Sequence, residues 1–233
     1  MTPHHERPSV TTRSELTDGV NIKATRVYIP FLDWLLYRHP FEGGSARRYA
    51  SDERPAFGDL DDRLLDGLAP ELSGEAKRLL DLGCGPATFA RRAAARFPAL
   101  TVIAIEPSRE FARPGVVRAA GEALPLAARS IDVAICLSSI RHVRDRAATL
   151  RELRRVVRGL AVIVELDPGA DRRRIANHAD RLGSPILRRV FGPLVVRTAP
   201  PAKAILTLAR DAGFTLRALR ADPIQPVFRM ELA

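Results

Sequence analysis

Short apolar runs alternate with amphipathic helical patterns along most of the chain after Lys77. The runs LTVIAI, VVRAA, IDVAICL and LAVIVEL have the length and apolar content of strands that are buried in a sheet. The stretches ATFARRAAARF, SREFA and DRAATLRELRRVV place apolar residues at helical spacing. Such alternation is typical of βαβ units, so it predicts an α/β fold with a doubly wound, mostly parallel, Rossmann-like sheet of seven strands.

The last two strand runs are connected differently from the others. FTLRALRA and PVFRMEL are separated only by DPIQ, which is too short for a crossover helix. We therefore expect these two strands to form an antiparallel hairpin at the carboxyl-terminal end of the chain.

The part of the chain before the first strand has a different character. Residues 1–20 have no periodicity and are expected to form a mobile tail. Residues 21–75 contain an aromatic block divided by two prolines, and then DLDDRLLDGLAPEL, whose leucines share one helical face. We interpret this region as an N-terminal helical cap or lid over a main domain formed by residues 76–233, in which residues 168–200 are an Arg-rich insertion.

Composition excludes several classes of protein. With 46% hydrophobic and 27% charged residues over 233 positions, the chain is neither a disordered tail nor a disulfide scaffold. Its apolar runs are shorter than the ~20 residues of a membrane span, and its first residues lack a signal core, so we expect a soluble, cytoplasmic protein. Cys84 and Cys136 lie in apolar runs, and no histidine has metal-ligand spacing to them. We expect neither a disulfide nor a metal site.

The net charge of +10 suggests a polyanionic partner only weakly. The basic residues are 34 Arg against 3 Lys, and a skewed genome composition would produce this bias on the surface of any protein. We therefore regard nucleic acid as an unlikely partner and a small molecule as the better expectation.

A glycine turn follows the strand LLDL. Gly83 and Gly85 allow the backbone to turn tightly and to approach a ligand, and the helix that opens near Ala87 supplies free N–H groups and a positive dipole. Thr88 stands where the dinucleotide fingerprint has its third glycine. This residue argues against a nicotinamide or flavin dinucleotide.

Two carboxylates flank this turn along the chain. Asp81 at the end of a buried strand needs a positive group or several donors, which a ligand ammonium or the loop backbone would supply. Glu106 closes the next strand about 20 residues after the glycines, where an acidic side chain can accept hydrogen bonds from ribose hydroxyls. The alternative role of Glu106 is to cap the helix that begins near Ser108.

Together these segments resemble the class I S-adenosylmethionine (SAM) dependent methyltransferases, in particular the small-molecule type-11 or UbiE-like branch. LLDLGCGPATFA is similar to the first motif of that family, AIEPS to the acidic second motif, and GEALPLAARSIDVAICLSSIRHVRD to the third region. ELRRVVRGLAVIVEL and ARDAGFTLRAL continue the match, which covers about Lys77 to Ala233. The resemblance implies SAM as the cofactor and S-adenosylhomocysteine as its product.

By position, the resemblance also implies where the cofactor lies. The glycines would pass beneath it, Asp81 would orient its methionine amino group and Glu106 would hold its ribose. Backbone at the Gly121 turn would meet the adenine, and the residues after IDVAICL would line the methyl-donor end. The implied cofactor-binding residues are Asp81, Gly83, Cys84, Gly85, Glu106, Pro107, Gly121, Glu122, Leu137 and Ser138, with Ser139 next to them.

Three positions depart from the family pattern. Ala120 stands where an aspartate is common, so adenine recognition must use backbone or another side chain. The usual Pro-Gly-Gly is shortened to Arg158 and Gly159. Arg141 replaces an aromatic or aliphatic residue, which predicts an unusually polar pocket wall.

Methyl transfer from a sulfonium needs alignment and a dry pocket more than a catalytic triad. His142 is the best candidate for a general base, and a packing or capping histidine is the alternative. Glu165 and Asp167 follow the next strand and either orient an acceptor or cap a loop. The candidate substrate-binding residues are Tyr28, Trp34 and Tyr37 of the aromatic block, which are otherwise core residues, together with Arg141 and Asp167.

We therefore expect a SAM-dependent methyltransferase that acts on a small molecule at oxygen, nitrogen or carbon. Seven Arg against two Asp between Asp171 and Arg197 favour an acidic acceptor or, equally simply, a solvated helical face. Two other functions stay open. One is a nicotinamide-dependent oxidoreductase, and the other is a non-catalytic protein of this fold that binds RNA or a protein partner.

Overall fold

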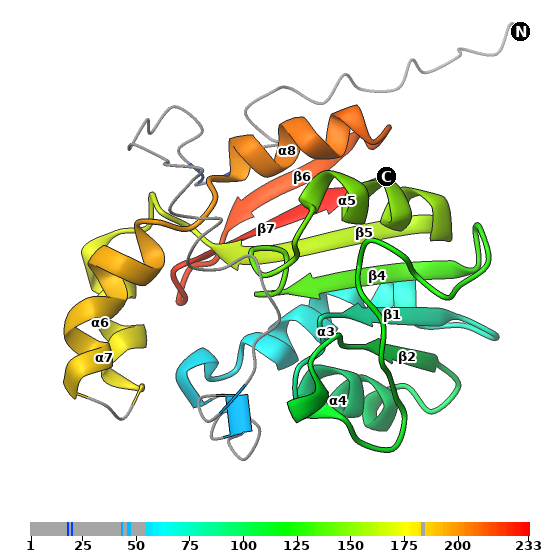
Figure 1. Cartoon of the computed structure of the whole chain (residues 1–233), viewed down its shortest axis with the longest axis horizontal. Coiled ribbons are helices and arrows are strands. Elements are labelled where there is room, and N and C mark those ends of the chain that lie inside the picture. Colours follow the sequence, from blue (N-terminus) through cyan, green and yellow to red (C-terminus); the bar gives the residue numbers. More distant parts are fainter. Residues whose placement is uncertain (1–17, 19, 21–42, 44–45, 48–54, 183–184) are drawn as a thin grey trace, which may run out of the picture.

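Seven strands form one mixed sheet in the order β3-β2-β1-β4-β5-β7-β6 (Figure 1). The computed structural model describes residues 18, 20, 43, 46–47, 55–182 and 185–233. Six strands are parallel, and β7 runs antiparallel to β5 and β6, which confirms the doubly wound sheet and the carboxyl-terminal hairpin. The strands are β1 (Arg78–Leu82), β2 (Thr101–Ile105), β3 (Val116–Val117), β4 (Ile131–Leu137), β5 (Val157–Leu166), β6 (Leu216–Ala221) and β7 (Val227–Leu232).

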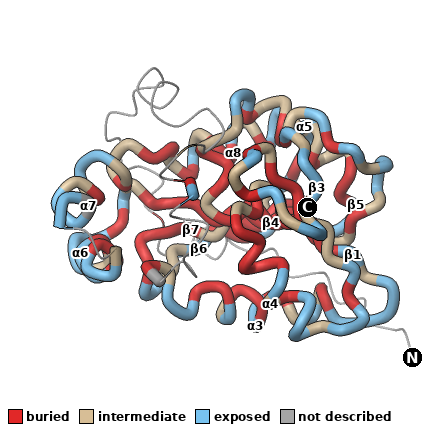
Figure 2. Tube along the Cα trace, turned by 60° about the horizontal axis from the view of Figure 1, so that its bottom comes forward, coloured by how far each residue is buried: buried red, intermediate tan, exposed pale blue. Residues whose placement is uncertain are grey.

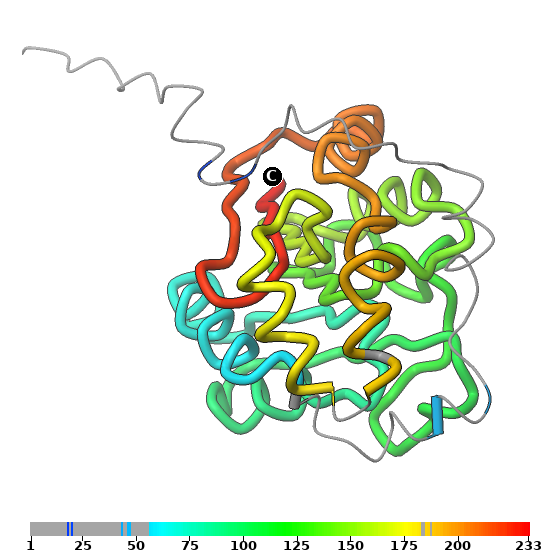
Figure 3. Tube along the Cα trace, turned by 90° about the vertical axis from the view of Figure 1, so that its left-hand side faces the viewer, coloured from blue at the N-terminus to red at the C-terminus, as the bar shows by residue number. Residues whose placement is uncertain are grey.

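Helices cover both faces of the sheet and its carboxyl edge. On one face lie α5 (Arg146–Val156) and α8 (Ala202–Asp211), and on the other α3 (Leu60–Leu72) and α4 (Thr88–Arg96). Beyond the carboxyl ends of the strands lie α6 (Arg172–Asp180), α7 (Pro185–Val190) and the π-helix η3 (Phe191–Val196) (Figure 1). Figure 3 shows this edge face-on, with α6 and η3 packed side by side across it.

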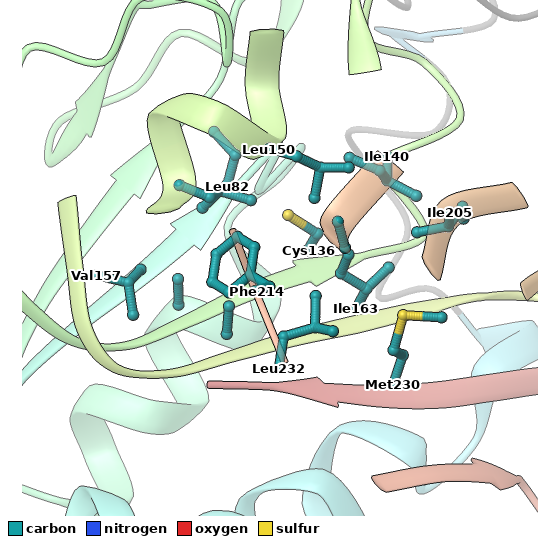
Figure 4. Close-up of a cluster of buried hydrophobic side chains, with 14 of the residues drawn as sticks. Leu82, Cys136, Ile140, Leu150, Val157, Ile163, Ile205, Phe214, Met230 and Leu232 are labelled. Atoms are coloured by element: carbon teal, nitrogen blue, oxygen red, sulfur yellow. The ribbon is translucent and has the colours of Figure 1, made fainter. Parts of the chain in front are cut away.

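Strand β4 explains why the central runs are apolar at nearly every position. Ala134 and Cys136 pack toward α5 and α8, in the cluster drawn in Figure 4, where Cys136 lies among side chains of β1, α5 and β5. Val133, Ile135 and Leu137 pack toward α3 and α4. A strand that is covered on both faces has no solvent side, so its sequence does not alternate. Figure 2 shows the resulting buried centre with exposed outer helices.

The leucine face predicted before the first strand is confirmed. Leu60, Leu64, Leu65 and Leu68 are all buried, in the same cluster as Leu79 and Phe89. Within the predicted tail, the structure describes Asp18 and Val20: the carbonyl of Asp18 accepts a hydrogen bond from the N–H of Ala221, and Val20 is buried. Tyr28, Phe31, Trp34 and Tyr37 lie outside the described residues, and the division into cap and main domain stays a prediction.

Two short elements differ from expectation. The run SREFA forms only one 3-10 turn, η2 (Arg109–Phe111), and the strand expected at VVRAA is only two residues long. Pro107 and Pro114 flank η2, and proline cannot continue a helix from the preceding residues. In the described part of the chain, no helix has the length and apolar character needed to cross a bilayer.

Candidate functional site

The loop after β1 is shaped by glycines and tied to the end of β2. Gly83 has φ +70° and Gly85 has φ +52°, a region that L side chains rarely adopt. The N–H groups of Gly83 and Cys84 both donate to the carbonyl of Ile105, at 2.8 and 3.1 Å. The chain therefore crosses the carboxyl ends of β1 and β2 with its backbone fixed.

Ser139 presses directly against this loop from the end of β4. Its Oγ donates to the carbonyl of Leu82 at 2.7 Å. A Cβ placed on Gly83 would lie 2.4 Å from the Cβ of Ser139, so only glycine fits there. The contact joins β1 to β4, where the strand order reverses and ligands of such sheets bind.

Helix α4 starts from this loop without a side-chain cap. Its N-cap, Ala87, is held at φ +55°, and its methyl side chain has no atom that could accept a hydrogen bond from the N–H groups of the first turn. Uncapped N–H groups and the helix dipole together favour an anion. The start of α4 can therefore hold a carboxylate or a phosphate.

Glu106 connects the two loops that border the site. It is buried; its Oε2 accepts from the N–H of Gly85 at 2.9 Å, and its Oε1 from the N–H of Ser108 at 2.9 Å. Burial raises the pKa of this carboxyl, and the two backbone hydrogen bonds oppose that shift. The turn η2 (Arg109–Phe111) is capped by Ser108, whose Oγ accepts from the N–H of Glu110 at 3.2 Å, so Glu106 binds the cap residue and does not cap the turn itself. Each carboxylate oxygen has a second lone pair, so the side chain can still accept from a ligand hydroxyl.

Asp81 lies deep in the sheet, at the end of β1. Its negative charge adds to burial in raising the pKa of the neighbouring thiols, to about 12 for Cys136 and beyond its usual range for Cys84. Both cysteines are buried, free and held in the neutral form, so neither is a nucleophile. Within the described residues, no three His, Cys, Asp or Glu side chains form a group that could hold a metal ion.

The turn predicted to meet the adenine packs against α5. A Cβ on Gly121 would lie 2.9 Å from Cγ2 of Thr149, and Oε1 of Glu122 accepts from the N–H of Asp145 at 2.9 Å. Close by, the carbonyl of Pro107 accepts from Nε of Arg118 at 3.3 Å. The side chain of Glu122 therefore holds the loop before α5, which leaves backbone atoms as the groups able to face a ligand here.

At the predicted methyl-donor end, backbone and side chains have separate roles. The side chain of Leu137 packs in the core under α3 and α4 rather than at the edge. Ser138 has φ +55° and donates its N–H to the carbonyl of Val164 at 2.7 Å. His142 follows in a half-buried turn, where its N–H donates to the carbonyl of Ser139.

Arg141 does not form an open polar wall. Its guanidinium is buried, 4.0 Å from Oε1 of the fully buried Glu165, and it donates to the carbonyl of Val195 in η3 at 3.1 Å. Arg146, also buried, donates to the carbonyls of Ile140 and Arg141. Burial raises the pKa of Glu165, and the positive charges of Arg141 and Arg146 oppose this shift. Sequence reasoning missed this network, although a glutamate that ends the apolar run LAVIVEL was a signal for a buried cation.

We predict that Arg141→Met lowers the free energy of unfolding by about 3–5 kcal/mol, because it leaves the Glu165 carboxylate buried without its ion pair. Adding Glu165→Gln should recover more than half of that loss, since it removes the orphaned charge. Urea denaturation followed by circular dichroism measures both variants, with Arg172→Met on the exposed side of α6 as the control. A double variant no more stable than the single one would contradict the assignment.

Asp167 and the Arg-rich insertion meet at the end of β5. Oδ1 of Asp167 accepts from the N–H of Gly169 at 2.8 Å, and burial raises the pKa of this carboxyl against the charges of Arg174 and Arg197. Arg197 donates to the carbonyls of Pro168 and Ala170. Of the seven arginines in this stretch, three bind groups of the protein itself: Arg174, Arg188 and Arg197.

The structure thus brings some of the predicted cofactor-binding residues together, and it directs the side chains of others away from them. The glycine loop, Asp81, Glu106 and Ser139 meet at the carboxyl ends of β1, β2 and β4. Leu137 and Glu122 point their side chains elsewhere.

Comparisons with known proteins agree with this geometry. Residues 80–164 match a family model described as a methyltransferase domain. An uncharacterized 37.1 kDa protein in transposon TN4556 of Streptomyces fradiae is 35% identical over 162 residues, covering 64% of this chain and 46% of that protein. The chain therefore spans about half the length of this curated relative.

Solved structures share the fold at low identity. A SAM-dependent methyltransferase from Aquifex aeolicus superposes with a TM-score of 0.62 at 14% identity, covering 82% of this chain and 98% of that one. A SAM-dependent methyltransferase from Mesorhizobium loti gives a TM-score of 0.53 at 18% identity, covering 76% and 99%. With its sheet order, its glycine loop and the methyltransferase-domain match over residues 80–164, the chain has the fold of the class I SAM-dependent methyltransferases.

Proposed function

We propose that this chain transfers a methyl group from SAM to a small-molecule acceptor. One observation carries the proposal: an uncapped helix start and two buried carboxylates, Asp81 and Glu106, meet around one glycine loop at the switch point of the sheet. No single ion would need this combination. A ligand with an ammonium, a carboxylate and ribose hydroxyls would use every part of it.

The residues present fit the chemical groups of SAM. Asp81 is the partner for the methionine ammonium, and the first turn of α4 is the partner for the methionine carboxylate. Glu106 keeps lone pairs for the ribose hydroxyls while it holds Gly85 and Ser108. Backbone at Gly121 and Glu122 is the proposed contact for the adenine.

Bound SAM would supply a methyl group on a sulfonium: a lone pair of the acceptor would form a bond to the methyl carbon while the C–S bond breaks, and S-adenosylhomocysteine would leave as the neutral thioether. The contribution of the protein is alignment and exclusion of water, so the rate enhancement comes chiefly from proximity. His142 would take a proton where the acceptor has one to lose. Asp167 and the aromatic residues Tyr28, Trp34 and Tyr37 are the proposed surroundings of the acceptor, whereas the buried Arg141 pairs with Glu165 and holds η3.

Calorimetric titration with S-adenosylhomocysteine and, in parallel, with NADH tests the cofactor assignment. We expect binding at about micromolar Kd or tighter for S-adenosylhomocysteine and no heat with NADH. Asp81→Asn should weaken binding about 10- to 100-fold, because a hydrogen bond to a charged group is lost. Asp211→Asn, an equal charge change at the exposed end of α8, is the control. Equal affinity in both variants would refute the role of Asp81.

The acceptor can then be found by transfer of labelled methyl groups to a metabolite extract. Labelled product that depends on the wild-type protein and is lost in Asp81→Asn would identify the acceptor class. Binding of NADH in place of S-adenosylhomocysteine would favour an oxidoreductase.

A further inference from the structure

Two arginines from separate parts of the chain converge on one carbonyl of the glycine loop. Arg91, on the second turn of α4, places its NH1 atom 2.6 Å from the carbonyl oxygen of Pro86. Arg113, in the loop between η2 and β3, places its NH1 atom 2.7 Å from the same oxygen. Arg113 is half-buried with its Nε out of solvent, and its charge lowers the pKa of Cys84, which places it against the loop.

This arrangement differs from that of the neighbouring arginines on α4. Arg92 and Arg96 pair with the carboxylates of Asp62 and Asp66 on α3. Arg91 and Arg113 instead bring two like charges together on a neutral oxygen, which costs Coulomb energy. The two hydrogen bonds to the Pro86 carbonyl have to offset this repulsion.

The N–H groups of the loop are already held by backbone carbonyls and by Glu106. The N–H groups of Gly83 and Cys84 bind the carbonyl of Ile105, that of Ala87 binds the carbonyl of Cys84, and that of Gly85 binds Glu106. The carbonyl of Pro86 immediately precedes Ala87, a non-glycine residue held in the left-handed region at φ +55°. Such a conformation persists only where surrounding contacts over-determine it.

We propose that Arg91 and Arg113 act as a redundant clamp that holds the Pro86 carbonyl and so preorganises the cofactor loop. They are positioning residues: they fix the peptide that leads into the first turn of α4, whose N–H groups face the ligand. The inference rests on the proposed function, since S-adenosylhomocysteine is the ligand whose binding would use the preformed loop. A carbonyl oxygen served by two donors keeps a partner when either one is removed.

The redundancy predicts a specific pattern of affinities for S-adenosylhomocysteine. Arg91→Met and Arg113→Met should each weaken binding by no more than about threefold, because one donor remains. The double variant should weaken it at least about tenfold beyond the product of the two single effects, since the carbonyl is then left without a partner. Arg109→Met, an exposed arginine next to the same site, removes equal charge and should leave the affinity unchanged.

Titration calorimetry at 15 °C, well below unfolding, measures the four variants and the wild type. If the loss of affinity in the double variant equals the product of the losses in the two single variants, the clamp is refuted and the two arginines act only through their charge. If the double variant does not fold, hydrogen exchange of the peptide that spans residues 80–95 decides instead. The exchange is then compared in Arg91→Lys, Arg113→Lys and the variant that carries both changes, because lysine keeps the charge and loses the planar guanidinium donor. Faster exchange in the double lysine variant than in either single one supports the clamp, and equal exchange in all three refutes it. Failure of the wild type to bind S-adenosylhomocysteine would refute the proposed function itself, whereas the exchange experiment would still test the clamp.

Discussion

Gly83→Ala is expected to abolish detectable binding of S-adenosylhomocysteine and to destabilise the fold by about 1–3 kcal/mol. The added Cβ would lie 2.4 Å from Cβ and 2.9 Å from Oγ of Ser139, in a chain already at φ +70°. Ser139 cannot retreat freely, because its hydroxyl is bonded to the carbonyl of Leu82. The loop must therefore move away from β4, and the groups around it lose their alignment.

Two second-site changes separate the steric cause from a general effect on the loop. Gly83→Ala with Ser139→Gly should recover part of the stability and of the affinity, since the opposing Cβ is gone. Gly83→Ala with Ser139→Ala should recover neither, because the clash of the two Cβ atoms remains. Thermal unfolding and calorimetric titration measure both pairs. Equal recovery in the two pairs would contradict the steric explanation.

Glu106→Gln is expected to weaken binding of S-adenosylhomocysteine about 100-fold. The amide has one acceptor oxygen, whereas the N–H groups of Gly85 and Ser108 require two, so one of them would face an NH₂ group. The acceptor for the ribose is weakened at the same time. Glu110→Gln is the matched control, because this nearby carboxylate pairs with the exposed Arg47 at 3.3 Å and its change should alter the affinity little.

The same carboxylate predicts how affinity changes with pH. Burial raises the pKa of Glu106, so its protonation begins above the usual glutamate range and removes an acceptor from the site. Affinity for S-adenosylhomocysteine should therefore fall as the pH is lowered through that raised pKa, and Glu106→Gln should lack this step. A wild-type affinity that stays flat from neutral pH down to the ordinary glutamate pKa of about 4.3 would contradict the role of Glu106.

The stability contribution of Glu106 has the opposite sign. Its pKa is raised in the folded state, so this group stabilises the fold most below its unfolded pKa, and that contribution is lost as the pH rises through the folded pKa. Acid thus weakens binding through Glu106 without weakening the fold through the same group. Measuring unfolding and binding on the same samples separates the local titration from acid unfolding.

Much of the architecture could be predicted from local pattern. Apart from Asp132, the run IDVAICL is apolar because β4 is covered on both faces, and the four residues DPIQ leave no room for a crossover helix between β6 and β7. The loop after β1 needs glycine because its φ angles are positive. Such features restrict which residue types can occupy the positions themselves, so they can be predicted without knowing which residues lie opposite.

The partners themselves could not be predicted in this way. Nothing near Gly83 in the sequence points to Ser139, and nothing near Arg141 points to the carbonyl of Val195, because these contacts join segments more than 50 residues apart. Leu137 shows the same limit: its position at a strand end suggested the site, while its side chain packs in the core.

The sequence by itself determined the α/β class, the glycine loop and the placement of acidic residues after the first two strands, since periodicity, turn residues and buried charge are local properties. Only the tertiary structure decided that β7 enters the sheet between β5 and β6 and that Glu106 accepts a hydrogen bond from Gly85. It also decided that Arg141 pairs with Glu165 and donates to a carbonyl of η3. These outcomes depend on which distant surfaces pack together, and a hydrogen bond is specified by both of its ends.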